Sequence, residues 1–252
     1  MNKKDTLAVN TGLIAGRILI EGGSEMERIN KTIKEIVNKA SDKDSQVFTS
    51  LTAIMVGVQD SSTMMFEQVE GRGINLEKIY QVDILVKQYI NDELSLEELY
   101  ARLKYLEKNI IDFSFFTKVA AAAVESAFLM VIFTQSLAFN DMLWTGVVGA
   151  IGYALATYLL KYTKIPFIRE FLGSLALGAA ALFGVRMGFA DNINYVIIGA
   201  VMPLVPGVAI TNSIRDLIEG NLVSGIERGF EATLTIFAIV SALALVLQYV
   251  TF

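Results

Sequence analysis

The 252-residue chain contains no histidine and no cysteine. It therefore cannot form a Ser-His-Asp triad, a Cys-His nucleophile, an imidazole or thiolate metal site, or a disulfide bond. Histidine is also the usual group for proton transfer near neutral pH. Any proton chemistry must run on carboxylate, lysine or tyrosine side chains. We accordingly expect no catalytic residue, no cofactor and no metal.

Charge is scarce in the second half of the chain. Residues 1–118 carry 33 of the 47 charged side chains, and residues 119–252 carry only 14. This contrast predicts a soluble domain over residues 1–114, followed by a transmembrane domain over residues 115–252. No basic face stands out, so we expect no nucleic-acid partner.

Five stretches in the second half are long and apolar enough to cross the hydrocarbon core of a bilayer. They are residues 119–139, 142–160, 165–185, 193–213 and 229–250. Basic residues favour alternate loops between them, with Arg186 as a mild exception. The positive-inside rule then places the N-terminal domain in the cytoplasm and the C-terminus outside. We predict a multi-pass α-helical protein of a bacterial inner membrane.

The soluble half reads as an α+β domain. Residues 7–20 predict a short buried helix, and S-x-x-E spacing at Ser24 and at Ser95 predicts two helix-starting capping boxes. Asn75 is a further helix cap. The β-branched residues 47–59 predict one strand, residues 60–63 a turn, and residues 64–69 a return strand.

The fourth span carries two of the three prolines. Pro203, Pro206 and Gly207 fall within five residues, which should break the helix near its middle. Broken backbone at membrane depth is tolerated where it packs in protein or lines a wet cavity, as in transporters. A plain packing kink is the alternative.

Polar side chains follow this break. Thr211 and Arg215 share one helix face, and Asn212 and Asp216 share another. The arginine could hold a substrate carboxylate, and the amide or carboxylate could accept an ammonium group. These residues and the break are the candidate substrate-binding site. Alternatively, Arg215 and Asp216 end the span in the headgroup region.

Two carboxylates lie within predicted spans. Glu125 in the first span is the leading candidate for a proton carrier, because burial favours its neutral form. Glu231 near the start of the fifth span is the second candidate, with Arg228 one turn earlier as its possible partner. Either residue could instead lie at the membrane interface.

Several segments resemble the threonine/serine exporter family of the ThrE type. They are GRILIEGGSEMERI (16–29), VFTSLTAI (47–54), NLEKI (75–79), ELSLEEL (93–99) and MPLVPGVAITNSIRDLIEGNLVSGIERGFEA (202–232). The resemblance covers the N-terminal module of the family, a cytoplasmic domain followed by about five spans. It implies an inner-membrane exporter of threonine and serine, or of a dicarboxylate such as succinate.

Full-length members of that family append a second module of about four spans, which this sequence does not include. The resemblance therefore implies a split, two-protein form with a separate four-span membrane subunit, a homo-oligomer, or both. Two other functions remain open. One is a membrane-anchored regulator or scaffold whose cytoplasmic domain binds a ligand or protein. The other is a membrane hydrolase using Glu21, Glu25 and Glu27, or Glu67 and Glu70.

Overall fold

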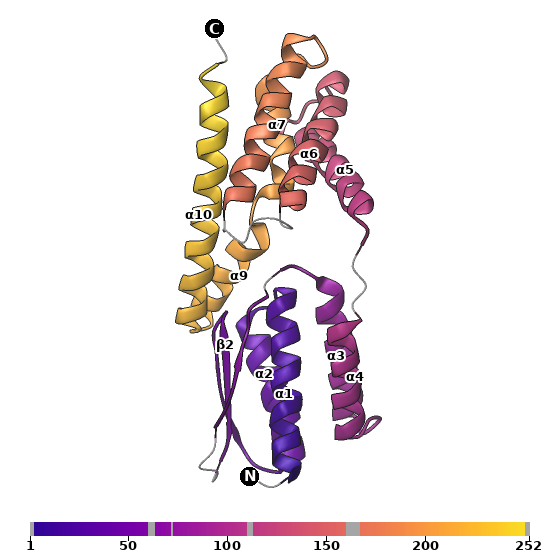
Figure 1. The fold of residues 1–252 in the computed structure, drawn as a ribbon, viewed down its shortest axis with the longest axis vertical. Coiled ribbons are helices and arrows are strands. Elements are labelled where there is room, and N and C mark those ends of the chain that lie inside the picture. Colours follow the sequence, from indigo (N-terminus) through magenta and orange to yellow (C-terminus); the bar gives the residue numbers. More distant parts are fainter. Residues whose placement is uncertain (1–2, 60–63, 72, 110–112, 160–166, 250–252) are drawn as a thin grey trace. The chain divides into compact units, whose positions relative to one another are not determined.

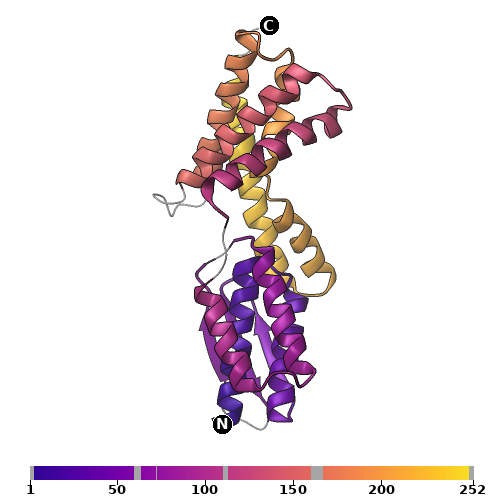
Figure 2. The same cartoon turned by 90° about the vertical axis from the view of Figure 1, so that its right-hand side faces the viewer.

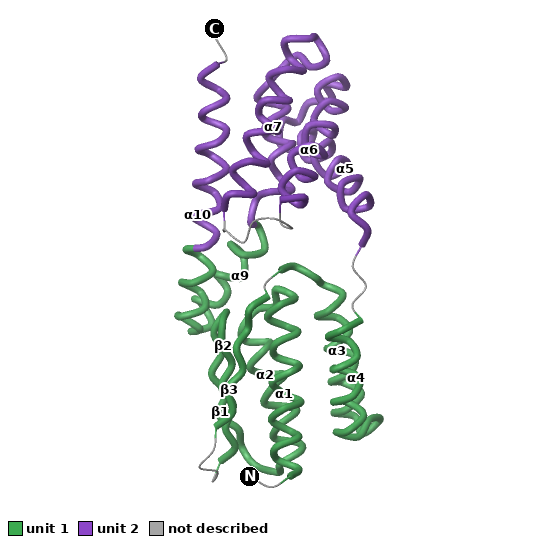
Figure 3. Tube along the Cα trace, viewed as in Figure 1, with its two compact units in different colours: residues 1–111, 207–230 green, residues 112–206, 231–252 purple. Residues whose placement is uncertain are grey.

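The computed structural model describes residues 3–59, 64–71, 73–109, 113–159 and 167–249. The chain divides into two compact units (Figure 3). Unit 1 comprises Met1–Ile111 together with Gly207–Phe230, and unit 2 comprises Asp112–Pro206 together with Glu231–Phe252. Unit 1 therefore contains most of the predicted soluble domain and, in addition, a segment from the second half of the chain.

Unit 1 is built in three layers, visible in Figures 1 and 2. A three-stranded antiparallel sheet in the order β1-β2-β3 forms the first layer. Helices α1 and α2 cover one face of the sheet, and α3 and α4 pack on the far side of α1. The element bounds are α1 (Lys3–Gly22), α2 (Met26–Ser41), β1 (Ser45–Thr49), β2 (Ala53–Val58), β3 (Met64–Gln68), α3 (Leu76–Ile90) and α4 (Leu96–Lys108).

One hydrophobic core holds these layers together. The apolar stripe of α2 (Ile29, Ile33, Ile36 and Val37) is fully buried, as its helical period predicts. Two local caps are confirmed. The Asn75 side chain accepts a hydrogen bond from Lys78 N–H, and Ser95 and Glu98 form the predicted capping box of α4.

Two predictions for unit 1 are wrong. Residues 47–59 are not one strand, because a turn at residues 50–52 divides them into the end of β1 and β2, and Ser50 N–H donates to Ala53 O. Ser24 does not cap α2, since the N-cap residue is Glu25 and its side chain caps no backbone N–H. The predicted turn at residues 60–63 lies outside the described residues.

Unit 2 consists of apolar helices. It contains α5 (Phe115–Thr134), α6 (Phe139–Leu159), α7 (Ile168–Arg186), the short helix α8 (Ile193–Ala200), the 3-10 turn η1 (Met202–Leu204) and the end of α10 (Leu222–Leu247). Four helices are long and apolar enough to cross a membrane: α5, α6, α7 and α10. The first and second spans start earlier than predicted, so Asp141 lies in the first turn of α6 rather than in a loop.

The predicted break in the fourth span is confirmed. The apolar segment Ile193–Leu204 and helix α9 (Gly207–Ile218) meet at an angle of 61°. Pro203 and Pro206 lack the N–H groups that would bind the carbonyls of Gly199 and Met202 in a continuous helix. Met202 O instead accepts from Val205 N–H, which closes a tight turn. The pair counts as a fifth span only if both halves are taken together.

Helix α8 packs in the middle of unit 2, against α5 and α6. A Cβ atom built on Gly199 would lie 2.6 Å from Ser126 O and 2.6 Å from the Met130 and Thr145 side chains. Only a glycine lets the backbones of α5 and α8 approach so closely. Gly199 is therefore required for the close packing of α8 against α5.

We predict that Gly199→Ala destabilises unit 2, whereas Gly207→Ala does not. The added methyl group at position 199 meets backbone on α5 and forces the helices apart, at a cost of about 1–3 kcal/mol. Gly207 faces open space, and a methyl group added there would meet nothing within 4 Å. Thermal unfolding in detergent should show a transition several degrees lower for Gly199→Ala only. Equal transitions would contradict the close packing of α8.

Candidate functional site

Helix α9 and the first turns of α10 form a hairpin that belongs to unit 1 (Figure 3). One face of α9 is buried there. The faces are those that the spacing predicted. Asn212 and Asp216 are buried, and Thr211 and Arg215 are exposed.

Asp216 has the most enclosed carboxylate of the hairpin. Its side chain is fully buried, and Oδ1 accepts a hydrogen bond of 3.0 Å from Met26 N–H, in the first turn of α2. Unsatisfied N–H groups and the helix dipole make a helix N-terminus a favourable place for a negative charge. Asp216 thus supplies the cap that Ser24 was predicted to give.

Arg228 on α10 completes this arrangement. Its Nε lies 3.2 Å from Asp216 Oδ2, and its Nη2 donates to Ser24 O at 2.6 Å. Asn212 Nδ2 donates to Gly23 O at 2.9 Å. The hairpin therefore binds the backbone of the α1–α2 loop through three side chains at once. Arg228 is thus an ion-pair partner of Asp216.

The hairpin also binds the turn between β1 and β2. Glu227 Oε2 accepts from Leu51 N–H at 3.1 Å, and Ser224 donates to Thr49 O at 3.4 Å. Ser213 donates to Gly225 O at 2.7 Å, which holds α9 against α10. These contacts fix the segment after the proline break to the α+β core.

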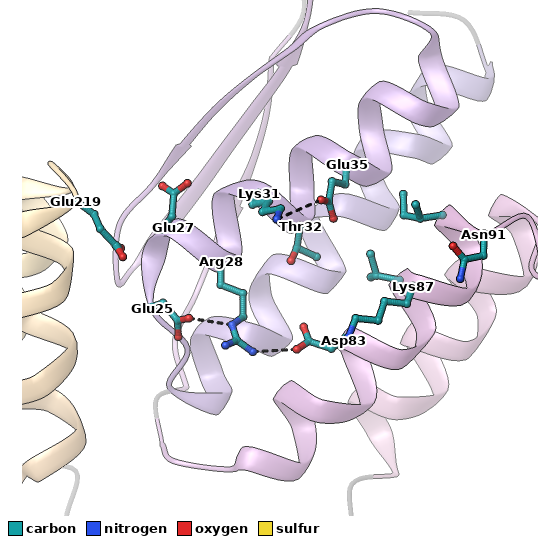
Figure 4. Close-up of a pocket in the computed structure, with 12 residues that line it drawn as sticks. Glu25, Glu27, Arg28, Lys31, Thr32, Glu35, Asp83, Lys87, Asn91 and Glu219 are labelled. Carbon is teal, nitrogen blue, oxygen red and sulfur yellow. Dashed lines mark hydrogen bonds and ion pairs between the residues drawn. The ribbon is translucent and has the colours of Figure 1, made fainter.

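A pocket of about 520 Å³ lies beside the hairpin contacts, between α2 and α3 (Figure 4). The Arg28 guanidinium bridges two carboxylates, with Nε 2.9 Å from Glu25 Oε1 and Nη1 2.9 Å from Asp83 Oδ2. Lys31 and Glu35 lie 3.9 Å apart on α2. Lys87 and Asn91 line the opposite wall, and Glu219 reaches the pocket from the end of α9.

Glu25 links the pocket to the hairpin, because its Oε1 also lies 3.5 Å from Arg215 Nη1. Burial opposes ionisation of Glu25. The backbone N–H of Glu25, the hydrogen bond from Arg28 and the charges of Arg28 and Arg215 outweigh burial, so the pKa of this carboxyl lies below its ordinary value. A pocket lined by both signs of charge suits a small zwitterion better than a simple anion or cation.

The remaining predicted site residues lie in unit 2 or at its edge. Pro203 and Pro206 are half-buried at the break, and Gly207 is exposed. Glu125 lies at the middle of α5 and is exposed. Glu231 lies half-buried on α10. The predicted site residues are thus shared between the two units.

Sequence reasoning missed two buried carboxylates of unit 2. Asp141 Oδ1 accepts from Asp191 N–H at 2.7 Å and from Asn192 N–H at 3.0 Å, just before α8 begins. Glu170 is buried at the start of α7 beside Arg169. Because both residues lie near the ends of predicted spans, the sequence pattern did not indicate that they are buried. Within the described ranges, no group of three or more acidic side chains could hold a metal ion.

A comparison with protein families matches residues 10–250 to ThrE, described as "Putative threonine/serine exporter". The chain belongs to the ThrE family. The match runs through both units, so the α+β domain and the apolar helices are parts of one family architecture. Comparisons with curated proteins and with solved structures gave no match. The family consists of transporters rather than enzymes, and the apolar helices make this ThrE chain a multi-pass membrane protein.

We predict that Arg228→Gln destabilises unit 1 strongly, while Arg215→Gln does not. Removing Arg228 leaves the fully buried Asp216 carboxylate without its cation, and breaking such a pair costs about 3–5 kcal/mol. Arg215 is half-exposed, and an ion pair there contributes about 0–1 kcal/mol. Thermal unfolding of both variants gives the comparison. Similar losses for the two would mean that Asp216 does not depend on Arg228.

We further predict that the stabilising effect of Glu25 depends on pH. Because its folded pKa is depressed, Glu25 stabilises unit 1 above its unfolded pKa, and this effect is lost as pH falls through the folded pKa. Glu25→Gln should therefore lower the unfolding temperature at pH 7 and have little effect near pH 3. Glu27→Gln, exposed on the same turn, is the matched control. A pH-independent difference for Glu25→Gln would contradict the ionic origin.

Proposed function

We propose that this ThrE chain is a subunit of a secondary-active exporter of small metabolites, with threonine and serine as its first candidate substrates. The observation that carries the proposal is the break between α8 and α9, which interrupts an apolar segment at Met202–Pro206. Interrupted backbone in a membrane protein offers carbonyl and amide groups to a polar substrate, which regular helices cannot do. The family assignment supports transport of threonine or serine.

We propose that substrate meets the chain at the break itself. Pro203, Pro206, Gly207 and the exposed Thr211 are the nearest candidate contacts. Asn212, Arg215 and Asp216 were predicted to bind substrate directly, but each has a partner on the α1–α2 loop or at the start of α2. In this proposal these three residues act indirectly, because their contacts hold α9 in place after the break. A dicarboxylate such as succinate is the second candidate substrate.

Coupling to protons is the remaining part of the proposal. In a chain without histidine, Glu125 and Glu231 are our candidate proton carriers, because each lies more than two turns from both ends of a long apolar helix, where protonation would change the charge within the membrane. The proposed orientation has unit 1 in the cytoplasm of a bacterial inner membrane and the C-terminus outside. It includes a separate membrane subunit, or further copies of the chain, as partners.

The pocket beside α2 favours one other function. A membrane-anchored regulator would bind a small ligand in unit 1, and the mixed charges around Arg28, Lys87 and Glu219 could receive a zwitterion. In that case the proline break would serve packing alone. The exporter and the regulator predict different effects of replacing the prolines. Transport is lost in the first case and unaffected in the second.

Efflux from proteoliposomes tests the exporter. We expect labelled threonine or serine to leave vesicles that contain the purified chain with its membrane partner, faster when a proton gradient is imposed. Pro203→Ala with Pro206→Ala should abolish efflux, because a continuous helix withdraws the exposed backbone groups, while thermal unfolding stays unchanged. Glu125→Gln should remove the dependence on the gradient, and Asp191→Asn, an exposed carboxylate of the α7–α8 loop, should not.

Each part of the proposal has its own contrary result. Normal efflux from the double proline variant would favour the regulator. Efflux that ignores the proton gradient would remove the coupling step and leave the exporter. Efflux of succinate but of neither amino acid would change the substrate class.

A further inference from the structure

Among the described residues of the long apolar helices, Glu125 is the acidic side chain closest to the middle of its helix. It is the eleventh of the 20 residues of α5, so about 15 Å of helix lies on either side of it. Its side chain is exposed and has no hydrogen bond or ion pair within the described residues. A carboxylate at the middle of a span is expected to face protein or a wet cavity, because hydrocarbon solvates it poorly.

The surface around Glu125 is apolar. Val124 and Phe128 are each 57% exposed, and Ile132 one turn further is 64% exposed. Thr117, Ala121 and Glu125 lie on the same face of α5, because each of the six residues has another of the set three or four positions away. We call this set the α5 outer face. The small side chains toward its beginning allow another helix to approach closely.

Unit 2 itself leaves this face uncovered. Of the four long apolar helices, α5 has the smallest share of its length buried. If the α5 outer face met lipid, the carboxylate would lie in hydrocarbon at the depth where it is least favourable. A covering segment that brings a lysine or arginine donor to Glu125 offsets that cost with a counter-ion.

A second copy of the chain does not bring such a donor. Among the described residues of the four long apolar helices, the basic side chains are Lys118, Arg169, Arg186 and Arg228. Each lies within about two turns of a helix end, far from the depth of Glu125. Two α5 outer faces related by a two-fold axis would instead bring two carboxylates together.

We propose that the α5 outer face docks a transmembrane helix of a different polypeptide, which presents a lysine or an arginine to Glu125. The proposal rests on the membrane partner in the proposed function and locates its contact. It also places the partner's donor directly beside the candidate proton carrier. The same polypeptide would then complete both the packing and the proton site.

The absence of cysteine gives a clean test, because a single introduced cysteine carries the only label. Nitroxide spin labels at Val124→Cys and Phe128→Cys report whether the face meets lipid, through their accessibility to dissolved oxygen. Phe237→Cys on α10, 70% exposed and without an adjacent acidic residue, is the control. The full chain is purified and labelled first, so that no other thiol reacts, and is then reconstituted with membranes of the organism that makes it.

We expect oxygen accessibility at positions 124 and 128 to be several-fold below that at position 237. In a Glu125→Leu background all three should become alike, and Glu125→Gln, which keeps a hydrogen-bonding group, should lie between. Equal accessibility at the three positions in the parent chain would overturn the proposal. Thermal unfolding of the Leu and Gln variants verifies that each remains folded.

A photo-crosslinking residue at position 128 identifies what covers the face. The proposal expects an adduct with a membrane protein whose cross-linked peptide is an apolar segment containing a donor side chain near its centre, lost in Glu125→Leu. An adduct of two copies of this chain would overturn it. Low oxygen accessibility without efflux of threonine, serine or succinate would contradict the exporter and support the docking face. Efflux with equal accessibility at the three positions would contradict the docking face and leave the exporter.

Discussion

Unit 1 depends on the contacts that the fully buried Asp216 carboxylate makes. It caps α2 through Met26 N–H and pairs with Arg228, which in turn binds Ser24 O. A buried charge needs both a counter-ion and hydrogen bonds to offset the loss of water. Because these partners come from the start of α2, from the loop just before it and from α10, the carboxylate links two regions about 190 residues apart in the sequence.

The contact between Asp216 and Met26 also shows why some predictions from the sequence were confirmed and one was wrong. Hydropathy located the apolar helices and the prolines located the break, because both signals are local. Asn75 and Ser95 were found as caps because each binds an N–H only three residues away. The N-terminus of α2 was predicted wrongly because its cap lies 190 residues further along the chain. No spacing rule for a single helix can reveal such a partner.

The candidate site shows a similar division. Sequence spacing placed Asn212 with Asp216 and Thr211 with Arg215 on the correct faces of α9. It could not show that the buried face serves the α+β core, since that depends on the tertiary contacts of Gly23 and Met26. The strand over residues 47–59 failed for a comparable reason. Its β-branched composition conceals the turn at residues 50–52, which the hairpin binds at Leu51.

The discontinuity of unit 1 has a consequence for biosynthesis. Translation at about 5–20 residues per second separates the synthesis of Met26 from that of Asp216 by about 10–40 seconds. During this interval α5, α6, α7 and α8 are made and can enter the membrane. The α+β core therefore waits, with the first turn of α2 uncapped, until the apolar helices have emerged. Unit 1 can therefore be completed only after the preceding apolar helices have been synthesised.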